Sequence, residues 1–449
     1  MSTRVAEELA RIEERVRAAQ GKGGRLYWVV LGCAVAATGT GIYSWSRIIR
    51  FGMGETGLNR PVAWGVLITD FVFWVGIAHS GTLISAILFL FRARFRTAVY
   101  RVAEAMTVFA VMTAGLFPII HLGRPWYGYW ILPYPNERSL WINFRSPLVW
   151  DAFAISTYLV VSSLFLVSGM VPDAAALRDA SAGWRRRLYA VFALGWRGTD
   201  EEWRHHSRAY LFFAAFATPL VISVHSVVSW DFAVSVVPGW HSTLFPPYFV
   251  AGAILSGVAM VLTLLVPLRR ALGIEELVTP GHLDLLSRLV LLTSLIVTFS
   301  YSIEFVLASW RGPRVELETL VFRAFGNYAP VFWTMVSCNC VIPLALFSAR
   351  VRRSGPALFA LGILVNVGMW LERFNIVVTS LSHNRIPFDW ATYRPSLVEI
   401  GITIGSFGWF FTWFLVFLKL LPAVSIAELK EEVGHEPAAA LGTEAIHAT

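Results

Sequence analysis

Ten long apolar stretches constrain what this chain can fold into. A helix needs about 20 apolar residues to cross the hydrocarbon core of a bilayer. Lipid offers no hydrogen-bond partners, so each span must pair its own backbone groups and is expected to be helical. Charged residues make up 15% of the chain, well below the roughly 25% of soluble domains. The sequence predicts an all-α integral membrane protein with spans at residues 26–48, 65–91, 101–121, 147–171, 208–231, 245–267, 284–308, 328–349, 356–378 and 396–421.

The Lys and Arg residues fall mainly on one side of the predicted membrane. If the amino terminus is cytoplasmic, the segments on that side, counted with Lys419, hold 25 of the 37 Lys and Arg residues. Short cytoplasmic loops carry such an excess, so both termini are expected to be cytoplasmic. The net charge of +8 is then explained by topology and does not indicate nucleic-acid binding.

Two terminal segments lie outside the predicted ten-helix domain of residues 26–424. Residues 1–25 have the pattern of an amphipathic helix, which suits either the inner membrane surface or an ordinary solvated helix. Residues 425–449 are polar and alanine-rich, and we expect them to form a mobile cytoplasmic tail.

The sequence also repeats itself weakly at an offset of 183 residues. Pro147 then falls on Pro330 and Trp150 on Trp333, within PLVWD and PVFWT. The alternative is chance similarity between apolar helices. We interpret residues 65–231 and 245–378 as two related four-helix bundles, with the first and last spans flanking them. Repeats of this kind often place a site at their interface.

Most ionisable residues within the spans are expected at one depth, one to two turns below the outer surface. Buried charges are costly in a membrane, so they are functional candidates by default. Their clustering favours a pocket rather than a continuous pore, because the inner span ends carry arginines that we expect to be solvated. Only His79 falls near the middle of the bilayer. The others are His121, Asp151, His225, Asp231, Glu304, Arg373, Glu399 and, slightly deeper, Asp70.

Each candidate also has a structural interpretation. His121 could cap its helix, and Asp151 could interact with the first helical turn that follows Pro147. Arg373 could pair locally with Glu372, and His79 could be a core histidine with satisfied hydrogen bonds. Buried Thr hydroxyls such as Thr107 and Thr113 are weak candidates for an inner proton path, because they usually bond to the preceding turn.

Oxidation of a quinol suits such a pocket. A quinol loses two protons with its two electrons, so each ring oxygen needs a hydrogen-bond acceptor. Histidine titrates near neutral pH, a carboxylate can take the second proton, and an arginine can keep a carboxylate ionised. The candidates for these roles are His121, Asp151, Asp231 and Arg373. We assign the wider quinol pocket to Arg124, Trp126, His225 and Glu304, and a proton path to His79, Asp70 and Glu304.

The chain shows no redox centre of its own. Cys33, Cys338 and Cys340 lie in apolar spans and do not form the cysteine set of an iron–sulfur or metal site. His121 and His225 could form a haem pair, which is a minor alternative. Electrons would otherwise have to pass to a neighbouring subunit.

Long strings around these residues resemble a known family. FPIIHLGRPW, NFRSPLVWD, SYSIEFVLASW and GMWLERFNIVVTSL are similar to the NrfD/PsrC family of integral membrane subunits. Within that family the similarity is closest to the ActC-type subunit of alternative complex III. The resemblance covers about residues 25–425.

The resemblance implies a quinol-binding subunit of the bacterial inner membrane that is not active alone. It implies a quinone, expected to be menaquinone, and neither haem nor an iron–sulfur cluster in this chain. The implied partners are an iron–sulfur subunit on the periplasmic face, multihaem cytochrome c subunits and a paralogous NrfD-like membrane subunit. His121, Asp151, Asp231 and Arg373 match the family's quinol-site positions. The aromatic loop 122–146 is expected to be a docking surface.

Two other functions are compatible with the sequence. The repeat and His79 would suit a proton- or ion-conducting subunit. Some paralogues in the resembled family lack a working quinol site, so a structural membrane anchor is the other alternative.

Overall fold

The structure is a computed structural model that describes residues 24–90, 99–132, 144–310, 312–422 and 424–427. Helices and turns account for all the regular structure in these residues, which contain no strand. Ten helical spans are long and apolar enough to cross a membrane, which confirms the predicted fold class. The spans run over Arg25–Phe51, Val66–Ala86, Tyr100–His121, Pro147–Asp179, Asp200–Ala233, Phe245–Leu272, Pro280–Trp310, Ala329–Phe347, Gly355–Ser382 and Leu397–Leu420.

Some of these spans are single α-helices, and three others contain a π-helical turn. The uninterrupted helices are α2 (Arg25–Phe51), α7 (Pro147–Asp179), α9 (Asp200–Ala233), α10 (Phe245–Leu272), α11 (Pro280–Trp310) and α17 (Leu397–Leu420). π-Turns follow α3 (Val66–Thr82), α13 (Ala329–Val336) and α15 (Gly355–Phe374). Such turns are often found at functional sites. The span Tyr100–His121 consists of α5 (Tyr100–Ala114) and α6 (Leu116–His121).

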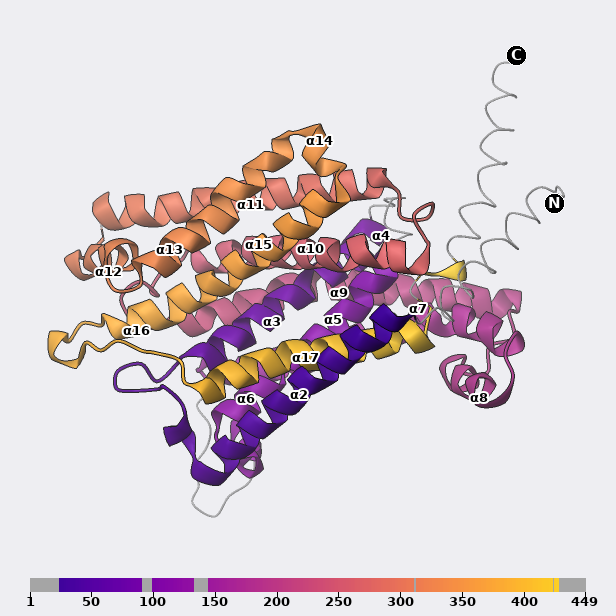
Figure 1. Ribbon diagram of the computed structural model, residues 1–449, viewed down its shortest axis with the longest axis horizontal. Coiled ribbons are helices and arrows are strands. Elements are labelled where there is room, and N and C mark those ends of the chain that lie inside the picture. Colours follow the sequence, from indigo (N-terminus) through magenta and orange to yellow (C-terminus); the bar gives the residue numbers. More distant parts are fainter. Residues whose placement is uncertain (1–23, 91–98, 133–143, 311, 423, 428–449) are drawn as a thin grey trace.

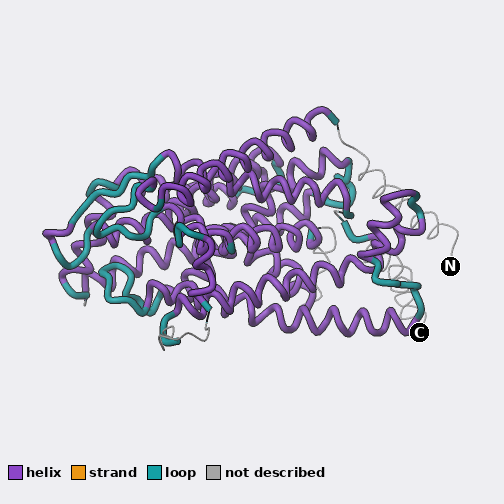
Figure 2. The backbone as a smooth tube through the Cα atoms, turned by 90° about the horizontal axis from the view of Figure 1, so that it is seen from below, coloured by secondary structure: helices purple, strands orange, loops and turns teal. Residues whose placement is uncertain are grey.

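The spans run side by side along the long axis of the molecule, and loops gather at its two ends (Figures 1 and 2). The short helix α8 (Gly183–Phe192) marks one end, and α12 (Arg314–Phe325) with α16 (Ser380–Ser382) marks the other. We call these the α8 end and the His121 end, since His121 closes α6 at the latter.

The helices contact one another in two groups. In the first half of the chain, α3 packs against α5 and α9, while α7 packs against α5 and α9. In the second half, α10 packs against α11 and α15, and α13 packs against α15. α10 also contacts α3 and α9, so it joins the two groups. The division into two related four-helix bundles stays a prediction, because α10 packs against α3 of the first half as extensively as against α15 of the second.

Local sequence fixes where several helices begin. Thr199 and Glu202 form a capping box at the start of α9, and Ser396 and Glu399 form another at the start of α17. Each box pairs two backbone N–H groups that a helix start would otherwise leave unbonded. Pro147 occupies the first turn of α7, where its missing N–H costs nothing.

The segment after α17 differs from the expected mobile tail. Ser425 and Ile426 are buried, and the Oδ1 atom of Asp173 accepts hydrogen bonds from the N–H groups of Ile426 (3.1 Å) and Ala427 (2.9 Å). The tail prediction was therefore wrong for residues 425–427, because a buried carboxylate of α7 binds this segment. The rest of the predicted tail and the segment 1–23 lie outside the described residues.

Helices α2 and α17 lie side by side (Figure 1), and small residues form their contact. A Cβ atom added to Gly405 would lie 2.3 Å from the Cα atom of Gly41, and one added to Gly408 would lie 2.5 Å from the backbone nitrogen of Thr38. Gly401 and Gly405 have the four-residue spacing that lets membrane helices make close backbone contact. The first and last spans are thus joined to each other.

We predict that Gly405→Leu destabilises the protein by at least about 2 kcal/mol, the scale of overpacking a tight contact. The leucine side chain would have to separate α2 from α17. Thermal unfolding in detergent measures the loss. Gly39→Leu is the control, because Gly39 is exposed on α2 with nothing within 4 Å of its added Cβ. Equal melting temperatures for the two variants would contradict the prediction.

Candidate functional site

Asp151 and Asp231 form a carboxyl pair at the His121 end, in which Asp151 is buried and Asp231 is half-buried. Asp151 lies in the second turn of α7, and Asp231 lies two residues before the end of α9. The two helices pack antiparallel, and the two side chains lie close enough to interact directly. Asp151 is 5% exposed. Two like charges this close repel each other when both are ionised, so the pair is suited to holding a proton.

The pair lacks the partners that buried carboxylates normally have. Within the described part of the chain, no N–H group and no Ser, Thr or Tyr hydroxyl donates to either side-chain oxygen of Asp151 or to Oδ1 of Asp231, and the partner of each carboxyl group is the other. Trp150 and Trp230, the residues that precede the two aspartates, pack edge to face with ring centroids 5.8 Å apart. An unsatisfied buried polar atom calls for an explanation, and a hydrogen-bonding ligand would supply one.

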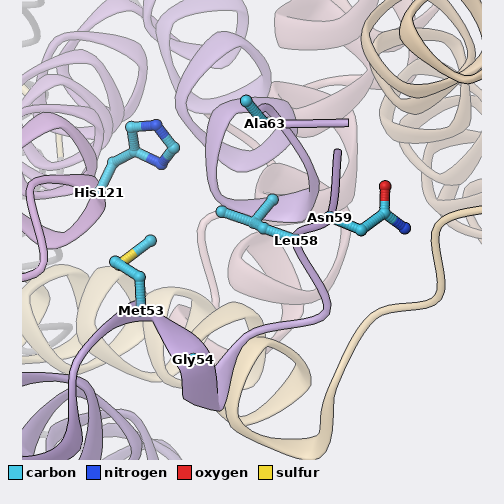
Figure 3. A pocket seen from close by; sticks show the side chains of 6 residues that line it. All are labelled: Met53, Gly54, Leu58, Asn59, Ala63 and His121. Atoms are coloured by element: carbon cyan, nitrogen blue, oxygen red, sulfur yellow. The ribbon is translucent and has the colours of Figure 1, made fainter. Parts of the chain in front are cut away.

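His121 faces a separate pocket at the same end. The pocket has a volume of about 450 Å³ and is lined by Met53, Gly54, Leu58, Asn59, Ala63 and His121. Figure 3 shows the imidazole ring projecting from α6 towards the segment that precedes α3. The Nδ1 atom of His121 is buried without a hydrogen-bond partner among the described residues. The site therefore combines one polar ring with mainly apolar walls, as binding pockets for small molecules usually do.

Arg373 lies deeper than the aspartate pair. It is 1% exposed and forms an ion pair with Glu372, which is the local pairing that the sequence left open. Its guanidinium carbon lies 5.4 Å from the ring centroid of Phe249. A Cβ atom on Gly252 would come within 3.4 Å of both terminal nitrogens. The absence of a side chain at this position of α10 thus makes room for the guanidinium between the two halves.

His225 contacts His79 and does not lie with the residues near the outer surface. The two ring centroids are 4.4 Å apart, and both side chains are fully buried. A Cβ atom on Gly76 would lie 3.7 Å from Arg373 Nη2 and 3.9 Å from His225 Cε1, so the arginine is a close neighbour of this histidine pair. The prediction that only His79 occupies the middle depth was wrong. His225 pairs with His79 and not with His121, the partner that the haem alternative required.

Other candidate residues have hydrogen-bonded or ionic partners of their own. Asp70 accepts hydrogen bonds from Trp370 (2.7 Å) and Thr403 (2.6 Å), which ties α3 to α15 and α17. Glu304 forms an ion pair with Arg323 at 2.9 Å. The structure does not bring these two acids to the Asp151–Asp231 pair.

The aromatic loop is only partly described. Arg124 and Trp126 are exposed beside and within a short 3-10 helix, Pro125–Ile131. Residues 133–143 of the predicted docking surface lie outside the described residues. The exposed rings of this segment include Trp126, Tyr129 and Trp130.

Sequence reasoning missed a buried charged cluster at the α8 end. Arg101, Glu104 and Asp173 are each at most 3% exposed. Arg101 lies 2.9 Å from an oxygen of Asp173 and 3.7 Å from one of Glu104. The expectation that the inner ends carry solvated arginines was therefore wrong for Arg101. The signal was the combination of Arg101 and Glu104 at the start of an apolar span with Asp173 just past the predicted end of another.

No group of three or more His, Cys, Asp or Glu side chains suited to a metal ion occurs within the described ranges. The carboxyl, imidazole and hydroxyl groups of the site can exchange protons and form hydrogen bonds.

Comparison with known proteins shows similarity along most of the chain. The chain is 26% identical over 395 residues to a candidate membrane subunit of dimethyl sulfoxide reductase from Halobacterium salinarum, covering 81% of this chain and 84% of that protein. It is 22% identical over 423 residues to a subunit of selenate reductase from Mesobacillus selenatarsenatis, covering 89% and 94%. It is also 22% identical over 240 residues to the Hdr-like menaquinol oxidoreductase integral membrane subunit of Archaeoglobus fulgidus, covering 53% and 49%.

The family model described as "Polysulphide reductase, NrfD" matches residues 54–383. This range contains the aspartate pair, the His121 pocket and the histidine pair. The described residues contain ten helical spans long and apolar enough to cross a membrane. With a family match over more than half of its length, the chain belongs to the NrfD family of integral membrane subunits of oxidoreductase complexes.

Proposed function

We propose that this chain is the quinol-binding and quinol-oxidising membrane subunit of a multi-subunit oxidoreductase of the alternative complex III type. The substrate is a quinol, most simply menaquinol, since one similar protein is a menaquinol oxidoreductase subunit. Electrons leave for an iron–sulfur or haem centre in a partner subunit at the His121 end. That end then faces the periplasm of a bacterial inner membrane, with both termini in the cytoplasm.

The observation that carries the proposal is the Asp151–Asp231 pair. Among the described residues, these carboxyl oxygens have each other but no N–H or hydroxyl donor, which is costly for a charged pair in an apolar environment. A quinol hydroxyl would give them a donor, and the pair could accept the proton when the quinol is oxidised. The position of the pair at the ends of α7 and α9 suits a ligand that arrives from the bilayer.

We assign the second proton acceptor to His121, which lies at the same end in its own pocket, so the bound quinol would have to extend between that pocket and the aspartate pair. Oxidation breaks both O–H bonds of the quinol, so two protons need acceptors while two electrons pass to the partner's centre. The free Nδ1 atom of His121 can accept one of them. Met53, Leu58 and Ala63 provide apolar walls beside the ring, as an isoprenoid-bearing molecule requires. Arg373 lies deeper, beside the histidine pair. We assign its positive charge an electrostatic effect on the protonation of those histidines.

We predict that Asp151→Asn and Asp231→Asn each lower quinol oxidation by the assembled complex at least about 100-fold, the usual contribution of a proton-transfer group. An amide keeps the shape of the side chain but cannot accept the proton. Steady-state quinol-dependent electron transfer, with assembly checked on a native gel, measures the effect. The control is Asp389→Asn, in a short surface 3-10 helix at the same end. Normal turnover in both assembled aspartate variants would refute the site.

We predict that His121→Gln lowers turnover and raises the KM for quinol, because the ring both binds the substrate and accepts a proton. Initial rates across a range of quinol concentrations separate the two effects. His241→Gln is the matched control, since His241 is an exposed histidine at the same end whose Nδ1 contacts the carbonyl oxygen of Ser235 at 3.0 Å. Identical kinetic constants for the two variants would show that His121 has no part in the site.

A further inference from the structure

Buried polar groups occur at intervals between the Asp151–Asp231 pair and the α8 end of the first helical group. They are carried by α3, α5, α7 and α9, which contact one another and run along the long axis. We propose that these groups form a proton-transfer route between the quinol site and the α8 end, through His225, His79, Tyr158 and Glu104. The proposal depends on the proposed function, because quinol chemistry is what changes the proton content of the site.

The histidine pair is the centre of this route. The Nδ1 atom of His79 lies 3.0 Å from the carbonyl oxygen of Val75, and its Nε2 atom contacts the carbonyl oxygen of Val221. A neutral imidazole can donate from only one nitrogen, whereas an imidazolium donates from both. His79 is thus arranged to stabilise an added proton.

His225 differs from His79 in the hydrogen bonding of its ring nitrogens. Neither of its ring nitrogens has a hydrogen-bond partner among the described residues, and its ring contacts that of His79. The nearby Arg373 guanidinium opposes a second positive charge. The carbonyl oxygens of Val75 and Val221 stabilise a proton on this pair, whereas the Arg373 guanidinium destabilises it. The two opposing effects favour transfer of the proton over its permanent binding.

A hydroxyl cluster adjoins His79 on the side away from the aspartates. The rings of Tyr158 and His79 have centroids 5.6 Å apart. The Tyr158 hydroxyl lies 2.8 Å from the Thr82 hydroxyl and donates to the carbonyl oxygen of Ala78 at 2.9 Å. Thr107 donates to the same carbonyl at 2.8 Å. A carbonyl oxygen only accepts, so the proton would pass directly between the Tyr158 and Thr107 hydroxyls, which interact with each other and can each accept one hydrogen bond while donating another.

Glu104 connects this cluster with the α8 end. It lies three residues before Thr107 on α5, and therefore on the same face of the helix. Tyr210 donates a hydrogen bond to its carboxylate at 3.1 Å. The buried Arg101–Asp173 ion pair follows immediately. Carboxylates that are buried and adjoin such chains are typical of proton relays in membrane proteins.

The step between the aspartates and the histidines is the longest. Asp231 and His225 are six residues apart on α9, a rise of about 9 Å. Bridging water can carry a proton over such a step, since it makes hydrogen bonds nearly as good as direct ones.

The electrons and protons of the reaction balance. Each quinol loses two electrons to the partner's iron–sulfur or haem centre and two protons to the site, and the route exchanges protons between the site and the α8 end.

The test uses the whole complex in liposomes with a trapped pH-sensitive dye. A membrane-impermeant electron acceptor such as ferricyanide selects complexes whose His121 end faces outward, so the α8 end faces the lumen. For wild type we expect a lumenal pH change that accompanies electron transfer and is reversed by an uncoupler. In Tyr158→Phe this change per electron falls at least about tenfold, a low bound for the loss of one transfer group.

Glu104→Gln is the second variant, because it retains an oxygen for the Tyr210 hydrogen bond. Thr113→Val is the control: it removes a buried hydroxyl from α5 that donates only to the preceding turn, to the carbonyl oxygen of Phe109. Its ratio of protons to electrons should equal that of wild type. A wild type without any lumenal change, or both variants with an unchanged ratio, would overturn the route. Loss of quinol oxidation is measured separately as the electron-transfer rate, so failure of the quinol site is distinguishable.

Discussion

The need to pair every charge that lies in the membrane organises this structure. Burying an ionised group in an apolar medium is costly unless hydrogen bonds or an opposite charge compensate it. Most of the buried acids meet this condition with protein partners, and these partners join helices that are distant in the sequence. The Asp151–Asp231 pair is the exception among the described residues, because its carboxyl groups contact each other and no cation or N–H donor, which separates a candidate ligand site from structural ion pairs. The compensated acids are Asp70, Glu104, Asp173, Asp284, Glu372 and Glu399.

The two halves of the chain meet around Arg373. This side chain leaves α15 in the second half and adjoins the histidines of α3 and α9 in the first, through space left by Gly76 and Gly252. Its ion pair with Glu372 extends the contact further, since Tyr301 of α11 donates a hydrogen bond to the same carboxylate. A charge change at the histidines is thus placed to affect the second half, because electrostatic interactions are strong where solvent is excluded.

Depth along the membrane could be predicted from the sequence, but rotation about each helix could not. Distance from the end of a span placed Asp151 and Asp231 at one level, and the structure brings them together. The same reasoning could not show that Glu304 faces Arg323, because that arginine lies on the short helix α12 between two spans. It also placed His225 too close to the surface, because the end of α9 does not lie level with the start of α3. Arg101 was missed because the span was predicted to begin at that residue.

The central claim is that the Asp151–Asp231 pair accepts a proton from the quinol. Infrared difference spectroscopy of the assembled complex, between its quinol-reduced and oxidised states, tests this directly through the C=O stretch of a protonated carboxyl group. We expect a carboxylic-acid band that changes with quinol oxidation and disappears in Asp151→Asn or Asp231→Asn. A band that persists unchanged in both variants, or a complex that oxidises quinol without any carboxylic-acid signal, would contradict the account.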